Sequence, residues 1–136
     1  MNPEQCIINE YTKNQGIAAH IDARTFGPIV VSISFLEPCN MILTKGDQRI
    51  SLQLAPRSML ILSGEARTSW KHEIEPVSEV YLTDCSVYQK PDNYRRLSLT
   101  YRTIALNFNT TSRVKILVLA STISHNRRAN VSYDSS

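Results

Sequence analysis

The chain has 136 residues, a length that suits one hydrophobic core and is too short for two full domains. Its hydrophobic fraction of 42% and charged fraction of 20% are those of an ordinary globular protein. No apolar run approaches the roughly 20 residues that cross a bilayer, and the first residues have neither a basic lead nor an apolar segment of the secretory type. We therefore expect a single domain that does not enter a membrane and resides in the cytoplasm or nucleus.

The distribution of charge indicates which partners the chain could bind, and the cysteines indicate whether it contains disulfides or a zinc site. Residues 1–94 hold 8 basic and 11 acidic side chains, whereas residues 95–136 hold 7 basic and 1 acidic. A basic C-terminal third can attract a polyanion, although such a stretch is more often a solvated surface. The 3 cysteines form no C-x-x-C pair, which argues against a disulfide framework or a zinc knuckle.

Short apolar segments rich in Val, Ile, Leu, Thr and Tyr recur along the chain and are separated by turn signals. These segments predict strands. They cover residues 6–11, 29–35, 41–43, 50–54, 59–62, 80–82 and 97–104. Residues 45–48, Lys-Gly-Asp-Gln, have the composition of a hairpin turn, and a strand is expected to end just before Gly64. Many short strands favour a β-sandwich or barrel.

His20 and Asp22 form an H-x-D pair, which places two ligand-type side chains on one face of an extended segment. His72 lies downstream and can supply a third ligand. Two imidazoles and one carboxylate on one face of a metal leave the opposite face open, as in non-haem iron(II) oxygenases. An H-x-D pair by itself is weak evidence, because a surface histidine and a loop aspartate produce the same pattern by chance.

The segment 96–102, Arg-Leu-Ser-Leu-Thr-Tyr-Arg, alternates apolar and polar residues. One interpretation is a surface strand with its apolar side on the core and its charges in solvent. The other places the polar side inside a barrel, where Arg96 and Arg102, with hydroxyls between them, form a pocket for a dicarboxylate.

Four elements in this order resemble the AlkB family of iron(II)- and 2-oxoglutarate-dependent dioxygenases. They are Asn9-Glu10-Tyr11, then Gly16 to Asp22 with the H-x-D pair, then Pro56 to Arg67 leading to Trp70-Lys71-His72, and finally Arg96 to Arg102. Together they span roughly residues 5–105 and are far more specific than any one of them. The Gly64-Glu65-Ala66-Arg67 turn and Ser98 look most like eukaryotic homologues related to the tRNA wobble-uridine hydroxylase.

The resemblance implies an all-β double-stranded β-helix, or jelly roll, with iron at its mouth. Carried over residue by residue, it makes the triad His20, Asp22 and His72 the iron ligands. It assigns the binding of the co-substrate 2-oxoglutarate to residues on two strands. These are Asn9, Tyr11, Arg96, Ser98 and Arg102, with Arg102 paired to the distal carboxylate and Arg96 assisting from the same face.

The implied reaction uses iron(II), 2-oxoglutarate and dioxygen to demethylate or hydroxylate a nucleic-acid base of RNA or DNA. A target base must be single-stranded or flipped out of its stack. Arg24, two residues after Asp22, has two interpretations that the sequence favours equally. It either contacts the substrate near the metal or is a solvated loop arginine. The basic side chains Arg113, Lys115, Arg127 and Arg128 could contact phosphates.

The domain division and one alternative function complete the expectations. Residues 1–106 are expected to form the catalytic core without the family's usual N-terminal lid. Residues 107–136 are expected to form a basic, partly disordered extension whose apolar run, 114–120, is an extra strand. The alternative is a truncated or non-catalytic AlkB-like module that binds nucleic acid or a protein partner. The candidate ligands favour the enzyme, and the missing lid favours the alternative.

Overall fold

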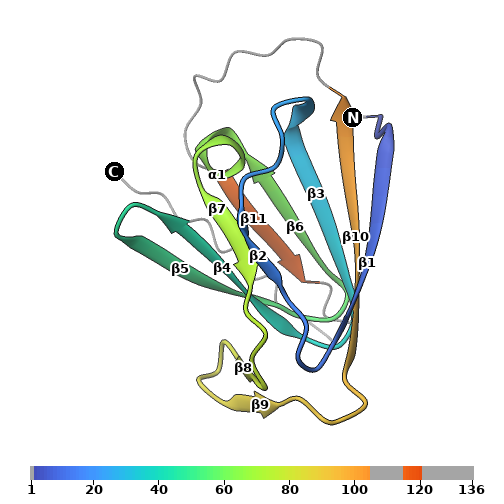
Figure 1. Cartoon of the computed structure of the whole chain (residues 1–136), viewed down its shortest axis with the longest axis vertical. Helices are drawn as coiled ribbons and strands as arrows, with labels where there is room; N and C mark the ends of the chain where they lie inside the picture. The colour runs from blue at the N-terminus through green and yellow to red at the C-terminus, as the bar shows by residue number, and fades with distance from the viewer. Residues whose placement is uncertain (1, 105–114, 121–136) are drawn as a thin grey trace.

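The computed structural model describes residues 2–104 and 115–120, in which two antiparallel sheets hold most of the regular structure (Figure 1). The larger sheet has the strand order β1 (Gln5–Thr12), β10 (Arg95–Ile104), β3 (Phe26–Leu36), β6 (Ser58–Ser63) and β11 (Lys115–Ala120). The smaller sheet has the order β2 (Ile17–His20), β7 (Lys71–Ile74), β4 (Cys39–Lys45) and β5 (Gln48–Leu54). A hairpin of β8 (Glu79–Tyr81) and β9 (Val87–Gln89) and the short helix α1 (Gly64–Thr68) complete the described part.

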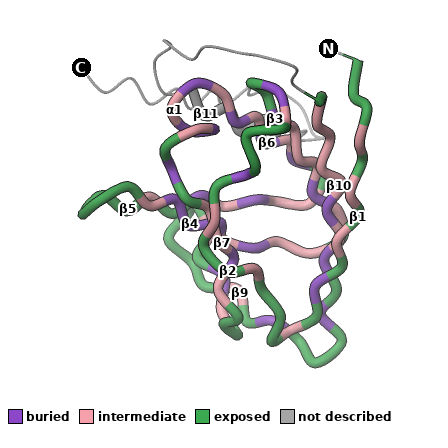
Figure 2. Tube along the Cα trace, turned by 45° about the horizontal axis from the view of Figure 1, so that its top comes forward, coloured by how far each residue is buried: buried purple, intermediate pink, exposed green. Residues whose placement is uncertain are grey.

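The core lies between the two sheets and is built by residues of both. The larger sheet contributes Tyr11, Val30, Leu60 and Leu62, and the smaller sheet contributes Met41, Leu43, Leu52, Leu54 and Ile74. Figure 2 shows buried positions recurring along the strands of both sheets. Two antiparallel sheets that pack face to face with inward and outward residues alternating are the layout of a jelly roll. The predicted all-β, double-stranded β-helix class is therefore confirmed.

Strand alternation decides between the two interpretations of segment 96–102. Arg96 and Ser98 are 1% and 3% exposed, whereas Arg95 on the other side of β10 is exposed. The polar side of β10 therefore faces the interior of the sandwich. The neighbouring strand β1 follows the same rule, because Tyr11 is buried while Glu10 and Thr12 are exposed.

Each of the strands predicted between residues 6 and 104 overlaps a strand of the structure, and the predicted hairpin joins β4 to β5. The short strands β2, β7 and β9 were not predicted. Lys45 pairs with Gln48, and Gly46 adopts a positive φ of 55°, a conformation that glycine adopts without steric cost. The connection after Gly64 differs from the expected turn, because it forms helix α1. A helix of five residues is too short for its hydrophobic period to be read from sequence. No helix in the described ranges is long and apolar enough to cross a membrane.

The apolar run 114–120, expected as an extra strand, forms β11 at the edge of the larger sheet. It pairs antiparallel with β6, with Val118 opposite Leu60. Residues 115–120 thus belong to the same sheet as the core, although the sequence places them beyond the expected boundary at residue 106. The rest of the predicted basic extension lies outside the described residues.

Gly16 connects β1 to β2 and allows the chain to pack directly on β7. A Cβ atom at this position would lie 2.0 Å from the carbonyl oxygen of Ile74. We expect Gly16→Ala to destabilise the fold by about 3 kcal/mol, because the clash is with main chain rather than with a flexible side chain. Gly46→Ala is the control: nothing lies within 4 Å of its Cβ, and its positive φ costs about 1 kcal/mol. Urea unfolding measures both, and equal stability of Gly16→Ala and the parent would contradict the packing.

Candidate active site

The structure brings His20, Asp22 and His72 together at the mouth of the sandwich. His20 is the last residue of β2 and pairs in register with His72 of β7, so that their ring centroids lie 4.3 Å apart. Asp22 follows in the loop after β2. One ligand atom from each of the three residues lies within 4.8 Å of the others. This group can hold a metal ion.

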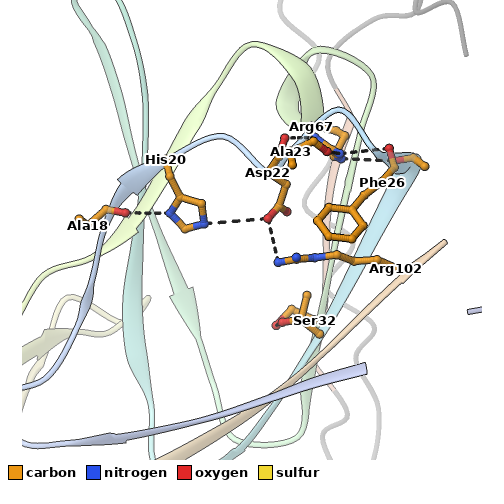
Figure 3. A network of polar contacts seen from close by, with 10 residues as sticks. Ala18, His20, Asp22, Ala23, Phe26, Ser32, Arg67 and Arg102 are labelled. Atoms are coloured by element: carbon orange, nitrogen blue, oxygen red, sulfur yellow. Dashed lines mark hydrogen bonds and ion pairs between the residues drawn. The ribbon is translucent and has the colours of Figure 1, made fainter. Parts of the chain in front are cut away.

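Both imidazoles are arranged to offer a lone pair. Nδ1 of His20 donates a hydrogen bond to the carbonyl oxygen of Ala18 at 2.8 Å, which leaves Nε2 as the acceptor, 3.9 Å from Oδ1 of Asp22 (Figure 3). A backbone partner of this kind fixes the tautomer of a metal-binding histidine. Burial lowers the pKa of His72 to about 4, with Asp22 acting in the opposite direction. His72 is therefore neutral at physiological pH, as a ligand must be.

Asp22 is only 5% exposed, and it is not part of a strand as the sequence argument assumed. Strand β2 ends at His20, and the loop that follows turns Asp22 toward β10. There Oδ1 of Asp22 forms an ion pair with Nη2 of Arg102 at 2.8 Å (Figure 3). His20 and Asp22 are therefore brought together by the loop after β2, and strand alternation alone does not explain their arrangement.

A cavity between the sheets continues inward from the triad. Its polar wall comes from β1 and β10, through Asn9, Tyr11, Arg96, Ser98, Thr100 and Arg102. Its apolar wall consists of Ile17, Val30, Met41, Leu60, Leu62 and Ile74. The five residues predicted to bind a co-substrate therefore line the same cavity as the three predicted metal ligands.

Arg96 lies in the interior with its donors only partly satisfied. Nη2 donates a hydrogen bond to Oγ of Ser34 at 2.9 Å, and the guanidinium lies 5.3 Å from the centre of the Tyr11 ring. Its Nε and Nη1 have no hydrogen-bond partner among the described residues. Burial raises the pKa of Tyr11, and the charge of Arg96 opposes that rise. A buried cation with free donors is the complement of a carboxylate.

Two features of the site were missed by the sequence analysis. Ser34 and Ser58 are each 1% exposed and lie opposite each other on β3 and β6. The signal for Ser34 was present, because Ser32 and Ser34 alternate with apolar residues in a strand, as Ser98 and Thr100 do in β10. Arg67 was quoted as part of a motif but given no role. It is buried on α1 and binds the loop that carries Asp22.

Arg24, the predicted substrate contact, is exposed on the loop between β2 and β3 and does not line the cavity. It stands two residues after Asp22 in the sequence. The basic residues Arg113, Arg127 and Arg128 lie outside the described residues. The side chain of Lys115, in β11, is not described.

A sequence model of the 2OG-Fe(II) oxygenase superfamily matches residues 1–102, three quarters of the chain. The chain belongs to this superfamily. The resemblance to AlkB-type proteins is confirmed by curated relatives, beginning with an Arabidopsis thaliana protein named "Alkylated DNA repair protein ALKBH8 homolog". It is 32% identical over 124 residues, which cover 76% of this chain and 35% of the relative.

Two mammalian relatives carry the name "tRNA (carboxymethyluridine(34)-5-O)-methyltransferase ALKBH8". The Macaca fascicularis protein is 38% identical over 74 residues, 53% of this chain and 11% of the relative. The Mus musculus protein is 36% identical over 77 residues, 54% of this chain and 11% of the relative. The chain thus spans about a third of the Arabidopsis protein and about a tenth of the mammalian ones.

The residues present fit the metal that the 2OG-Fe(II) oxygenase superfamily implies. Two imidazoles and one carboxylate are the donor set of non-haem iron(II) sites, and here one ligand atom of each residue lies within 4.8 Å of the others. The cavity that these three residues line also contains Arg96 with donors that lack a partner among the described residues, which suits the carboxylate of 2-oxoglutarate.

We expect His72→Ala to weaken the binding of Co²⁺, a spectroscopic substitute for iron(II). The loss should exceed the roughly tenfold to 100-fold that removal of an outer partner of a ligand costs. Glu73→Gln is the control, because Glu73 is the next residue of β7 and contacts Arg49 at 4.0 Å instead of the triad. Titration followed by Co²⁺ absorption measures both. Equal binding by His72→Ala and Glu73→Gln would contradict the triad.

Proposed function

We propose that this chain is an iron(II)- and 2-oxoglutarate-dependent dioxygenase that oxidises a modified base of RNA. The observation that supports this proposal is that one cavity is lined both by a His-Asp-His group and by Arg96 with unpaired donors. A metal site alone suits many functions. A metal site beside a buried guanidinium suits a reaction that needs a metal and a carboxylate co-substrate together.

In this proposal Nε2 of His20, the carboxylate of Asp22 and His72 hold iron(II). The iron would supply the activation of dioxygen, coupled to decarboxylation of 2-oxoglutarate, that oxidises a C–H bond of the substrate. The residues of the chain hold the metal and orient the co-substrate. The apolar wall limits water, which protects a reactive site from side reactions.

The geometry supports a division between the two arginines that is the reverse of the one the family resemblance gave. Arg102 contacts the metal ligand Asp22 at 2.8 Å, so it lies at the metal end of the cavity. Arg96 contacts Ser34 and Tyr11 in the interior. We therefore assign the distal carboxylate of 2-oxoglutarate to Arg96, and the carboxylate nearer the metal to Arg102.

Hydrogen-bonding side chains around Arg96 suit the rest of the co-substrate. Asn9, Tyr11 and Ser98 line the polar wall of the cavity. Serine at position 98 is shorter than the asparagine common in bacterial AlkB-like proteins. In this assignment all of the predicted co-substrate residues lie on the polar wall of the cavity.

The names of the mammalian relatives support RNA, and tRNA in particular, as the substrate. Those names state methyl transfer to a carboxymethyluridine at position 34 of tRNA, and this chain spans about a tenth of each such protein. We do not assign methyl transfer to this chain. We propose instead that it oxidises a carbon attached to a tRNA base, by hydroxylation or by demethylation, with Arg24 as a phosphate contact.

The decisive experiment is an anaerobic titration with iron(II) and 2-oxoglutarate that follows the visible charge-transfer band of their chelate. The parent should show the band, and in air it should form succinate together with an oxidised base in a tRNA that carries C5-modified or methylated uridines. Succinate without any change in the RNA would reject this substrate. A folded parent without the band would reject catalysis and support the non-catalytic binding module instead.

We expect Arg96→Gln to weaken 2-oxoglutarate binding by at least roughly 30-fold, because loss of one partner of a buried charged pair costs about 2 kcal/mol or more. Co²⁺ binding should remain close to that of the parent. Arg95→Gln is the matched control, since Arg95 is adjacent on β10 but exposed and paired with Glu10. Titration of the chelate band measures both variants. Equal affinity for 2-oxoglutarate would contradict the assignment of Arg96.

A further inference from the structure

Arg67 is a buried arginine that donates four hydrogen bonds, all to main-chain carbonyls. It is 3% exposed and lies on α1. Its Nη1 donates to the carbonyl of Asp22 at 3.0 Å, its Nη2 to those of Ala23 at 2.8 Å and Phe26 at 3.3 Å, and its Nε to that of Gly27 at 3.3 Å. Figure 3 shows the guanidinium next to the carbonyl groups of this segment.

The four carbonyls belong to residues 22–27, which begin with the candidate metal ligand in the loop after β2 and end with the first two residues of β3. The loop is held at other points as well. The amide of Phe26 donates to the carbonyl of Ala23 at 3.1 Å, and the Phe26 ring lies 4.6 Å from the guanidinium of Arg102. At its end, a Cβ atom on Gly27 would meet the hydroxyl of Thr103 at 1.9 Å.

The two arginines that contact this loop differ in what they bind. Arg102 binds the carboxylate of Asp22, which is the group that a metal ion would share or take over. Arg67 binds only main chain and makes no ion pair with a carboxylate among the described residues. A metal can therefore change the partners of the Asp22 carboxylate while the contacts of Arg67 remain.

Buried arginines are usually paired with an acidic side chain, since burial of an unpaired charge is costly. Here the planar donor fork spans four carbonyls of one short segment, of which Asp22 and Gly27 are buried residues. No other residue type offers five donors in a fixed fork. The position thus requires the shape of arginine as well as its charge.

We propose that Arg67 is a positioning residue for the metal site: by holding the main chain of residues 22–27 it fixes where the Asp22 carboxylate lies, and so sets metal affinity. This inference rests on the proposed metal site. Arg67 acts through the loop and does not touch the metal. Lysine at this position keeps the charge but has no planar fork, so it restores the loop only in part.

The test compares Arg67→Gln, Arg67→Lys and Leu54→Ala with the parent. Leu54 is 0% exposed on β5 and not among the residues that line the cavity, so Leu54→Ala destabilises the fold without touching the loop. For each protein, Co²⁺ affinity is measured by absorption titration, the melting temperature is measured in chelator, and hydrogen exchange is measured for the amides of residues 23–27.

We expect Arg67→Gln to bind Co²⁺ roughly tenfold to 100-fold more weakly than the parent, the range for outer partners of metal ligands. Arg67→Lys should lie in between, and both should exchange the loop amides faster. Leu54→Ala should keep parental affinity in spite of its lower melting temperature. Parental Co²⁺ affinity in a folded Arg67→Gln would overturn the inference. If that variant does not fold, parental affinity in Arg67→Lys overturns it. A parent that binds no Co²⁺ overturns the metal site itself.

Discussion

The burial of two arginines on the inner side of β10 is the constraint on which the site depends. Arg96 is 1% exposed, and the side chain of Arg102 is 13% exposed. Among the described residues, Asp22 is the acidic group that pairs with either of them. Two guanidinium groups facing one carboxylate leave the cavity with a net positive charge, which favours the binding of an anion. The serines of β3, β6 and β10 supply hydrogen-bonding groups around it.

The two sheets have different roles in this arrangement. The larger sheet provides the polar wall, because β1 and β10 lie side by side and present Tyr11, Arg96 and Ser98 inward. The smaller sheet provides the two imidazoles, through β2 and β7, and the loop after β2 provides the carboxylate of Asp22. The site forms only where the sheets face each other, so metal binding and packing of the sandwich are linked thermodynamically.

Two arginines hold Asp22, the carboxylate of the candidate metal site, one through its side chain and one through its main chain. Arg102 neutralises the side chain of Asp22 in the absence of a metal, which offsets the cost of burying a carboxylate that is only 5% exposed. Arg67 holds the backbone of the same residue through the neighbouring carbonyls. A side-chain contact that can be exchanged and a main-chain contact that persists together allow a buried ligand to change partners without movement of the loop.

Local pattern in the sequence determined most of the strands and the hairpin at Gly46, because alternation and turn chemistry act over a few residues. The full set of candidate site residues came from the family resemblance. The sequence also supplied the four motifs that indicated the superfamily. The sequence left open which side of β10 faces inward, since a strand with polar and apolar sides fits either orientation. That choice was decided by tertiary structure, through the packing of β10 between β1 and β3 opposite the smaller sheet. Tertiary structure alone also placed Ser34 beside Arg96 and Arg67 against the Asp22 loop, because residues 62 and 45 positions apart meet only when strands and helix pack.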